Sequence, residues 1–213
     1  MSRPCNLAVT LAALCFVFAS PLSAQPTAPP AADTVRPARQ AAVALQQAEQ
    51  THLWRVAAWG STNVLGGLAL MWGTSRSRRS AQWHFGAMSA GWGAVNVGIA
   101  TVGLLSSNAP APDPSVVLSA ERQFHDILLF NLGLNVAYSA VGGTMLGAGY
   151  QGVSNADRWR GFGTALILQG AGLLVLDGIA FFASRTRLGD LLGPSSDLAV
   201  HLRPTQVVVA LQF

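Results

Sequence analysis

Acidic side chains are the first place to look for chemistry in this chain, and Asp177 is the most unusual of them. It lies inside residues 161–183, a stretch with no other charged residue, and an acid in such a stretch is a candidate functional group. Counting about 1.5 Å of helical rise per residue puts further polar residues at its depth: Arg55, His125, Asp126 and Asn131. We expect Arg55 to pair with Asp177, flanked by His125 and Asp126, in a cluster that closes one end of a helical bundle. The alternative is a proton or ligand site open at that end, with His125 titrating near neutral pH.

Four amide side chains form a second candidate group. Asn63, Asn96, Asn135 and Gln169 each lie near the middle of a long uncharged stretch. An amide without a partner is costly in hydrocarbon, and amide pairs between membrane helices contribute about 0.6 to 2 kcal/mol. We therefore expect a polar layer in which these groups bond to one another or to backbone carbonyls and fix the helix register. A polar pathway or a ligand site is the alternative.

Metal binding and hydrolysis are not expected. Glu121 and His125 share a helical face, but His84 is expected at the opposite membrane surface, and His52 and His201 are assigned to flexible or terminal regions. The chain has no G-x-S-x-G sequence and no serine next to a histidine. We predict no metal, no cofactor and no enzymatic activity.

Long uncharged stretches must position these residues. There are four, residues 56–73, 85–106, 127–150 and 161–183, the last interrupted only by Asp177, and each is close to the roughly 20 residues that cross a bilayer as a helix. The chain is 51% hydrophobic and only 10% charged, and a soluble bundle would carry charges on the outer faces of its helices. We predict an all-α fold, a four-helix transmembrane bundle; an exported soluble bundle that binds an apolar ligand is the alternative. Ridges of small residues predict close packing through two faces: Ala90, Ala94 and Gly98, and Ser139, Gly143 and Gly147.

The segments outside the spans complete the domain organisation. Residues 1–24 have the layout of a secretory signal peptide, and they contain both cysteines, Cys5 and Cys15. Residues 25–37 are rich in Pro, Ala and Thr and are expected to form a flexible linker. The membrane domain covers residues 38–184, with an amphipathic extension on its first helix. In residues 185–213 we expect two short strands, as a hairpin or an extended tail.

The arginines suggest an orientation. The two shortest connecting turns contain five of them: Arg76, Arg78, Arg79, Arg158 and Arg160. Basic residues favour the cytoplasmic side, so we expect a bacterial inner-membrane protein with both termini in the periplasm; Arg185 and Arg187, just beyond the last span, oppose this orientation. The remaining arginines are scattered, so nucleic acid is not an expected partner.

Three segments resemble a known family: "WHFGAMSAGWGAVNVGIATVGL", "LLFNLGLNVAYSAVGG" and "GFGTALILQGAGLLVLD". The most specific elements are His84 with Met88, Gly91-Trp92 with Asn96, Asn131 with Asn135 and Tyr138, and Gln169-Gly170 with Asp177. This pattern is similar to that of a bacterial family of small, signal-bearing envelope proteins carrying a domain of unknown function. The resemblance covers roughly residues 54–182 and implies a four-helix membrane bundle, but no activity.

Together these features predict an integral membrane protein that acts as a non-enzymatic structural or interaction component of the bacterial envelope. Its expected partner is the lipid bilayer, together with further copies of itself or other membrane proteins. The main alternative is a subunit of a small transporter or channel that uses Asp177 and the central amides.

Overall fold

The computed structural model describes residues 32–78, 80–193, 200–203 and 206–209 of the 213-residue chain. Four helices account for most of them: α1 (Ala32–Gly73), α2 (Ser80–Ser106), α3 (Pro114–Tyr150) and α4 (Ala156–Leu192). The predicted helical architecture with four helices is confirmed. α1 begins at Ala32 and contains Pro37, so it includes part of the segment 25–37 that was predicted to be a flexible linker. The expected signal peptide lies outside the described residues.

Two short strands follow the helices, β1 (Val200–Arg203) and β2 (Gln206–Val209). They pair antiparallel, with Val200 opposite Val209 and Arg203 opposite Gln206. The neighbouring residues 194–199, 204–205 and 210–213 are not described, so the packing of the C-terminal tail stays a prediction.

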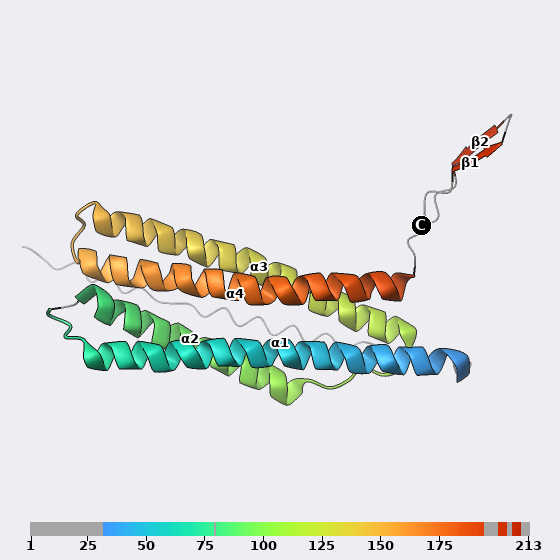
Figure 1. Cartoon of the computed structure of the whole chain (residues 1–213), viewed down its shortest axis with the longest axis horizontal. Helices are drawn as coiled ribbons and strands as arrows, with labels where there is room; N and C mark the ends of the chain where they lie inside the picture. The colour runs from blue at the N-terminus through green and yellow to red at the C-terminus, as the bar shows by residue number, and fades with distance from the viewer. Residues whose placement is uncertain (1–31, 79, 194–199, 204–205, 210–213) are drawn as a thin grey trace, which may run out of the picture.

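The helices form two antiparallel hairpins (Figure 1). α1 packs along α2, α3 packs along α4, and contacts between α2 and α4 join the hairpins, whereas α1 makes few contacts with α3 or α4. The loops at residues 74–78 and 151–155 lie together at one end of the bundle, on the left in Figure 1; we call it the short-loop end. α2 has 27 residues, whereas α1 has 42 and α3 and α4 have 37 each. The three longer helices therefore extend past the end of α2.

Local sequence explains the helix boundaries. Asp113 caps α3, its Oδ1 accepting hydrogen bonds from the Ser115 backbone N–H at 2.9 Å and the Val116 backbone N–H at 3.3 Å, and Pro114 begins the helix, where its missing N–H costs nothing. Hydrogen bonds from the Ser115 hydroxyl and from these backbone N–H groups hold the pKa of Asp113 below its ordinary value. Asn155 precedes α4 with a φ of 61°, a left-handed conformation that asparagine adopts more readily than most residues.

A seven-residue repeat sets the contact between α3 and α4. Each helix has a series of buried residues spaced seven apart: Glu121, Leu128, Asn135, Gly142 and Gly149 on α3, and Gly163, Gly170, Asp177 and Ser184 on α4. The carbonyl of Gly163 would lie 2.7 Å from a Cβ added at Gly142, so the two backbones approach closely there. Seven-residue spacing is typical of helices packed at a shallow left-handed angle.

The faces used for close packing differ from those expected. Ala90 does contact Gly67 of α1, and Ser139 faces Gly170 of α4. The other expected positions point outward: Ala94 is exposed, and a Cβ added at Gly98, Gly143 or Gly147 would meet nothing within 4 Å. One residue along a helix is a rotation of about 100°, so Gly142 faces α4 whereas its neighbour Gly143 does not.

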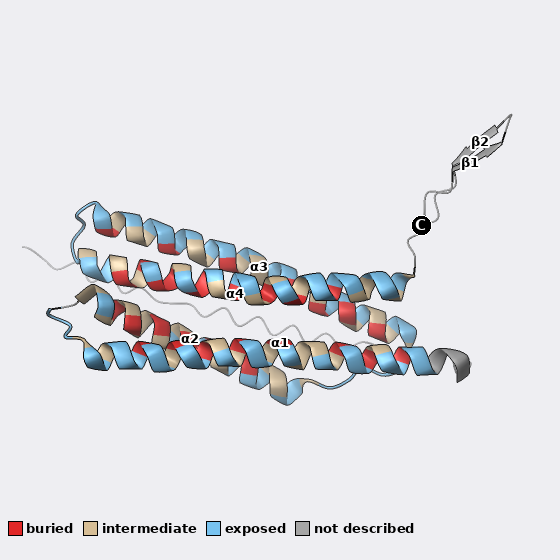
Figure 2. Cartoon of the chain, in the orientation of Figure 1, coloured by how far each residue is buried: buried red, intermediate tan, exposed pale blue. Residues whose placement is uncertain are grey.

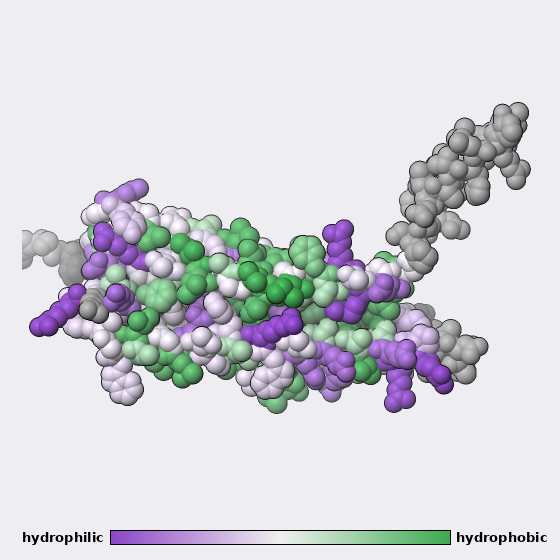
Figure 3. Space-filling view, in the orientation of Figure 1, coloured by the Kyte–Doolittle hydropathy of each residue, from purple (hydrophilic) through white to green (hydrophobic). Residues whose placement is uncertain are grey.

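Much of the outer surface of the bundle is apolar. α2, α3 and α4 are long and apolar enough to cross a membrane, and only 22%, 17% and 39% of their most apolar 18-residue windows are buried. Figure 2 shows exposed residues along the outer faces of these helices, and Figure 3 shows hydrophobic side chains over much of the middle of the bundle. α1 is not among the three, so the predicted fourth span does not follow from length and composition alone.

Candidate functional site

Asp177 lies at the meeting point of three helices. Asp177 is only 4% exposed. Nε2 of His52, on α1, lies 3.1 Å from Oδ1, and Nδ2 of Asn135, on α3, donates a hydrogen bond of 2.5 Å to Oδ2. Both carboxylate oxygens are therefore engaged, one by an imidazole and one by an amide.

His52 has a second ring nitrogen that is not engaged. The residue is 7% exposed, and its Nδ1 is buried with no hydrogen-bond partner among the described residues. The ring meets Phe124 edge-on, with centroids 6.3 Å apart. The chemistry open to this arrangement is the exchange of a proton between the imidazole, the carboxylate and a small polar species at Nδ1.

The structure corrects the predicted partner of Asp177. Arg55 is exposed and does not pair with it, because Arg55 lies one position from the buried Val56 and faces away from the bundle. The other predicted residues make no hydrogen bond to Asp177 in the described structure either: Asp126 is exposed, Asn131 is half-buried, and His125 stacks on Phe181 with centroids 4.4 Å apart. His52 was the missed residue. His52 comes seven residues after Leu45 and four before Val56, which are both apolar and both buried. This helical spacing could have predicted that His52 lies on the inner face of α1.

The four expected amides do not form one layer. Gln169 is fully buried, and its Oε1 accepts hydrogen bonds from Nε1 of Trp59 at 3.1 Å and from Nδ2 of Asn96 at 3.4 Å. Asn63 instead donates to the carbonyl of Trp59 on its own helix, at 2.8 Å. Asn135 belongs to the Asp177 site. One contact between expected layer members, Asn96 with Gln169, is therefore present.

A second buried acid, Glu121, is held by α4. It is 1% exposed and accepts a 2.5 Å hydrogen bond from the hydroxyl of Ser184. The guanidinium of Arg187 contacts both carboxylate oxygens, Nε at 3.0 Å from Oε2 and Nη2 at 2.9 Å from Oε1. Glu121 and Ser184 occupy opposite positions of the seven-residue repeat, so the spacing that packs glycines elsewhere brings this pair together.

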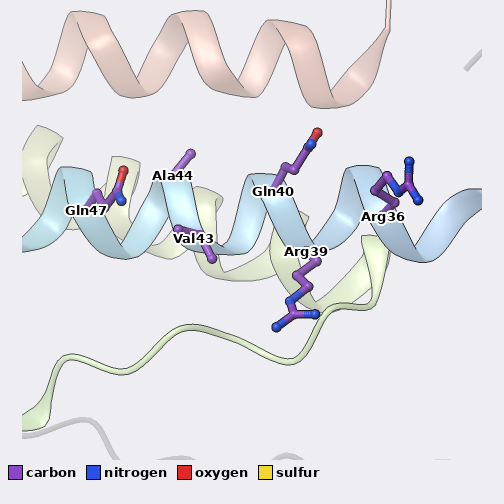
Figure 4. A pocket seen from close by; sticks show the side chains of 6 residues that line it. All are labelled: Arg36, Arg39, Gln40, Val43, Ala44 and Gln47. Carbon is purple, nitrogen blue, oxygen red and sulfur yellow. The ribbon is translucent and has the colours of Figure 1, made fainter.

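Two further features of the described residues bear on metal and ligand binding. Within the described part of the chain, no group of three or more His, Cys, Asp or Glu side chains is placed to hold a metal ion. A groove of about 510 Å³ runs beside the first half of α1. Figure 4 shows its six lining side chains, all from that one helix, with Arg39 pointing away from Gln40. Side chains from a single helix face do not enclose a ligand.

Comparison with known proteins gives one match. A family described as a family of unknown function, DUF6992, matches residues 55–178, which is more than half of the 213 residues. No curated protein and no solved structure matches the chain. The matched region includes Glu121, Asn135 and Asp177 but not His52 or Arg187.

Proposed function

The chain belongs to the DUF6992 family, and we propose that it is an integral membrane protein whose four helices all cross the bilayer, serving as a structural or interaction component of a bacterial envelope rather than as an enzyme. The observation that carries this proposal is the distribution of polarity. The outward faces of α2, α3 and α4 are apolar, while the buried residues include Asn96, Glu121, Gln169 and Asp177. Such an arrangement suits hydrocarbon better than water.

The second half of α1 supplies the fourth span. Residues 56–73 carry no charge and run antiparallel to α2 at the same depth. The carbonyl of Gly93 would lie 2.7 Å from a Cβ added at Gly60, and Ala90 contacts Gly67 one heptad further on. When α2 crosses the membrane, this half of α1 must cross beside it.

The arginines support an inner-membrane orientation. The short-loop end carries Arg76, Arg78, Arg158 and Arg160, and cytoplasmic loops are enriched in basic residues. Export of the N-terminus by a signal peptide in residues 1–24 would then leave both termini in the periplasm.

The buried polar groups support a structural role. Asp177, Glu121 and Gln169 are each hydrogen-bonded to side chains of other helices, and contacts of this kind fix register and partner choice between membrane helices. The groove beside the first half of α1 is not lined by Asp177.

A proton- or ion-translocating subunit is the second candidate. It is favoured by one observation, the unpartnered Nδ1 of His52 beside Asp177 in the described structure. In proteoliposomes, a proton flux that disappears in the Asp177→Asn variant would establish this candidate and contradict a purely structural role.

Single-cysteine labelling tests the membrane proposal. Cysteines are placed at Ser77, Asn108 and Ser154, in the three loops between helices, and intact cells are treated with an impermeant maleimide. We expect Asn108→Cys to label from outside, and Ser77→Cys and Ser154→Cys to label only after the inner membrane is opened. A chain that is extracted by carbonate and labels at all three positions would overturn the proposal in favour of an exported soluble bundle.

A further inference from the structure

We propose that the short-loop end binds one anionic phospholipid, with an acyl chain in an apolar groove between the helices and the phosphate at Arg160. The inference rests on the proposed membrane insertion. It assigns a ligand class to a groove that the contacts described above do not use.

The groove has a volume of about 710 Å³, and all four helices contribute to its lining. Both hairpins line it, and α1 makes few contacts with α3 and α4 over its whole length. Its walls are largely apolar, with Leu70 and Gly73 from α1, Phe85 from α2 and Leu146 from α3. An acyl chain can pack against such an apolar surface, whereas a free phosphate ion gains nothing from contact with it.

Arg160 stands at the rim in a fixed orientation. Its Nε donates a 2.9 Å hydrogen bond to the carbonyl of Gly149, and its guanidinium lies over the ring of Tyr150, 4.8 Å from the centroid. Its side chain is still 39% exposed, and its contact with the exposed Asp157 is a loose 3.6 Å pair. A guanidinium held in this way presents its remaining N–H groups to a phosphate without further ordering.

The charge around the groove selects an anionic head group. Asp157 is the only acid in residues 74–85 and 146–164, which also contain five arginines. A surplus of arginine at the cytoplasmic surface attracts anionic lipids, and a zwitterionic head group gains less from it. Tyr150 and Trp72, both exposed at helix ends, are side chains typical of the membrane interface, so Arg160 lies at head-group depth.

The test measures lipid retained by the full-length protein. The chain is reconstituted in vesicles of equal parts phosphatidylglycerol and phosphatidylethanolamine, extracted in mild detergent, and its bound lipid is quantified by native mass spectrometry. Gly73→Leu fills the groove, and because a Cβ at Gly73 meets nothing within 4 Å, it does so without strain. Arg160→Gln removes the rim charge. We expect each variant to retain at least about tenfold less phosphatidylglycerol than wild type.

Two matched controls isolate the groove. Gly66→Leu adds the same side chain to α1 at another open position, and Arg78→Gln removes a charge at the same end, and neither residue lines the groove. Gly66→Leu should retain phosphatidylglycerol as wild type does. Arg78→Gln, which removes one of the surrounding charges but no residue of the groove lining, should lose clearly less phosphatidylglycerol than Arg160→Gln. Three results would each overturn the proposal. They are retention of as much phosphatidylglycerol by Gly73→Leu as by wild type, a loss of it in Arg78→Gln as large as that in Arg160→Gln, and retention by wild type of as much phosphatidylethanolamine as phosphatidylglycerol.

Two more results would overturn the proposal in distinguishable ways. If wild type does not enter the vesicles at all, the membrane proposal itself fails. If Gly73→Leu converts a dimer into a monomer while lipid retention is unchanged, a second copy of the chain occupies the groove and the lipid proposal is wrong.

Discussion

The imidazole of His52 lies against the carboxylate of Asp177, with Nε2 3.1 Å from Oδ1 and both side chains buried. The two residues come from the first and last helices, which otherwise make few contacts. This pair, with Asn135, is therefore a main polar link between α1 and the α3–α4 hairpin.

Removing one member of the pair should be more harmful than removing both. His52→Ala leaves a buried carboxylate with Asn135 as its one remaining side-chain partner in the described structure, and we expect a loss of about 3 to 5 kcal/mol in the free energy of unfolding. The double variant His52→Leu/Asp177→Leu should recover most of that loss, because no unpaired charge remains. Denaturant-induced unfolding in detergent micelles measures the free energy of unfolding of both variants.

His125→Ala is the control, because His125 does not contact Asp177, and it should cost about 1 kcal/mol or less. Equal losses in His52→Ala and His125→Ala would contradict the importance of the pair.

The Glu121 cluster makes a similar prediction at the far end of the bundle. Arg187→Ala removes both guanidinium contacts and leaves the hydroxyl of Ser184 as the one remaining side-chain donor among the described residues, so we expect a loss of about 3 kcal/mol or more. Arg187→Lys should restore only part of it, since an ammonium cannot contact both oxygens in the same planar geometry. Arg185→Ala, two residues away and exposed, is the control and should be nearly neutral. A neutral Arg187→Ala would show that the contact adds no stability.

Glu49 should make stability depend on pH. Burial, the largest cause, and the nearby Glu121 raise the pKa of Glu49, while Arg187 lowers it by a smaller amount. Because the folded pKa exceeds the ordinary value of 4.5, the folded state holds the proton more tightly than the unfolded state. Ionised Glu49 therefore destabilises the fold at pH values above its raised pKa. This destabilisation disappears as the pH falls from the pKa of Glu49 in the folded state to its pKa in the unfolded state.

Glu49→Gln removes this penalty. We expect its Tm to exceed that of wild type by about 1 to 3 °C at pH 7 to 8 and the difference to vanish near pH 4. Thermal unfolding of the two proteins across this range measures it. A constant difference at every pH would mean that the carboxyl group does not titrate within the fold as described.

Adjacent glycines on α3 allow a matched test of helix packing. A Cβ at Gly142 would meet the carbonyl of Gly163 at 2.7 Å, whereas one at Gly143 meets nothing within 4 Å. Gly142→Ala should therefore cost about 1 to 3 kcal/mol, and Gly143→Ala should be neutral or slightly stabilising because alanine favours helix. Similar effects of the two substitutions on unfolding would contradict the close contact between α3 and α4.

Depth along the helices could be predicted from the sequence, but rotation about their axes could not. The uncharged stretches and the proline- and arginine-rich turns place four helices correctly, and counting residues from the turns brings Asn96 level with Gln169, which do meet. The same counting put Arg55 near the level of Asp177, but the partner is His52, three residues earlier and on the inner face. The side chains of a uniformly apolar helix give little signal for which face is inside.

The seven-residue repeat contains the missing rotational information. It links Glu121, Asn135 and Gly142 on one helix and Gly163, Asp177 and Ser184 on the next. Polar and glycine residues at this spacing mark the inner face in a bundle whose outer face is apolar, since a soluble bundle would show the reverse pattern. A search for this period would have placed Glu121 opposite Ser184 and excluded Gly143 from the contact.

The short length of α2 determines how far the protein reaches beyond the lipid. In the proposed orientation, about 20 residues of α4 from Arg160 onward cross roughly 30 Å of hydrocarbon. Residues 181–192 of α4 then project roughly 18 Å further, at about 1.5 Å per residue, alongside α1 and α3 and braced by the contact between Arg187 and Glu121. In that orientation the three long helices would act as a spacer between the head groups and the end of α4. Deleting one heptad from each projecting helix would lower this end by roughly 10 Å while leaving the same faces in contact.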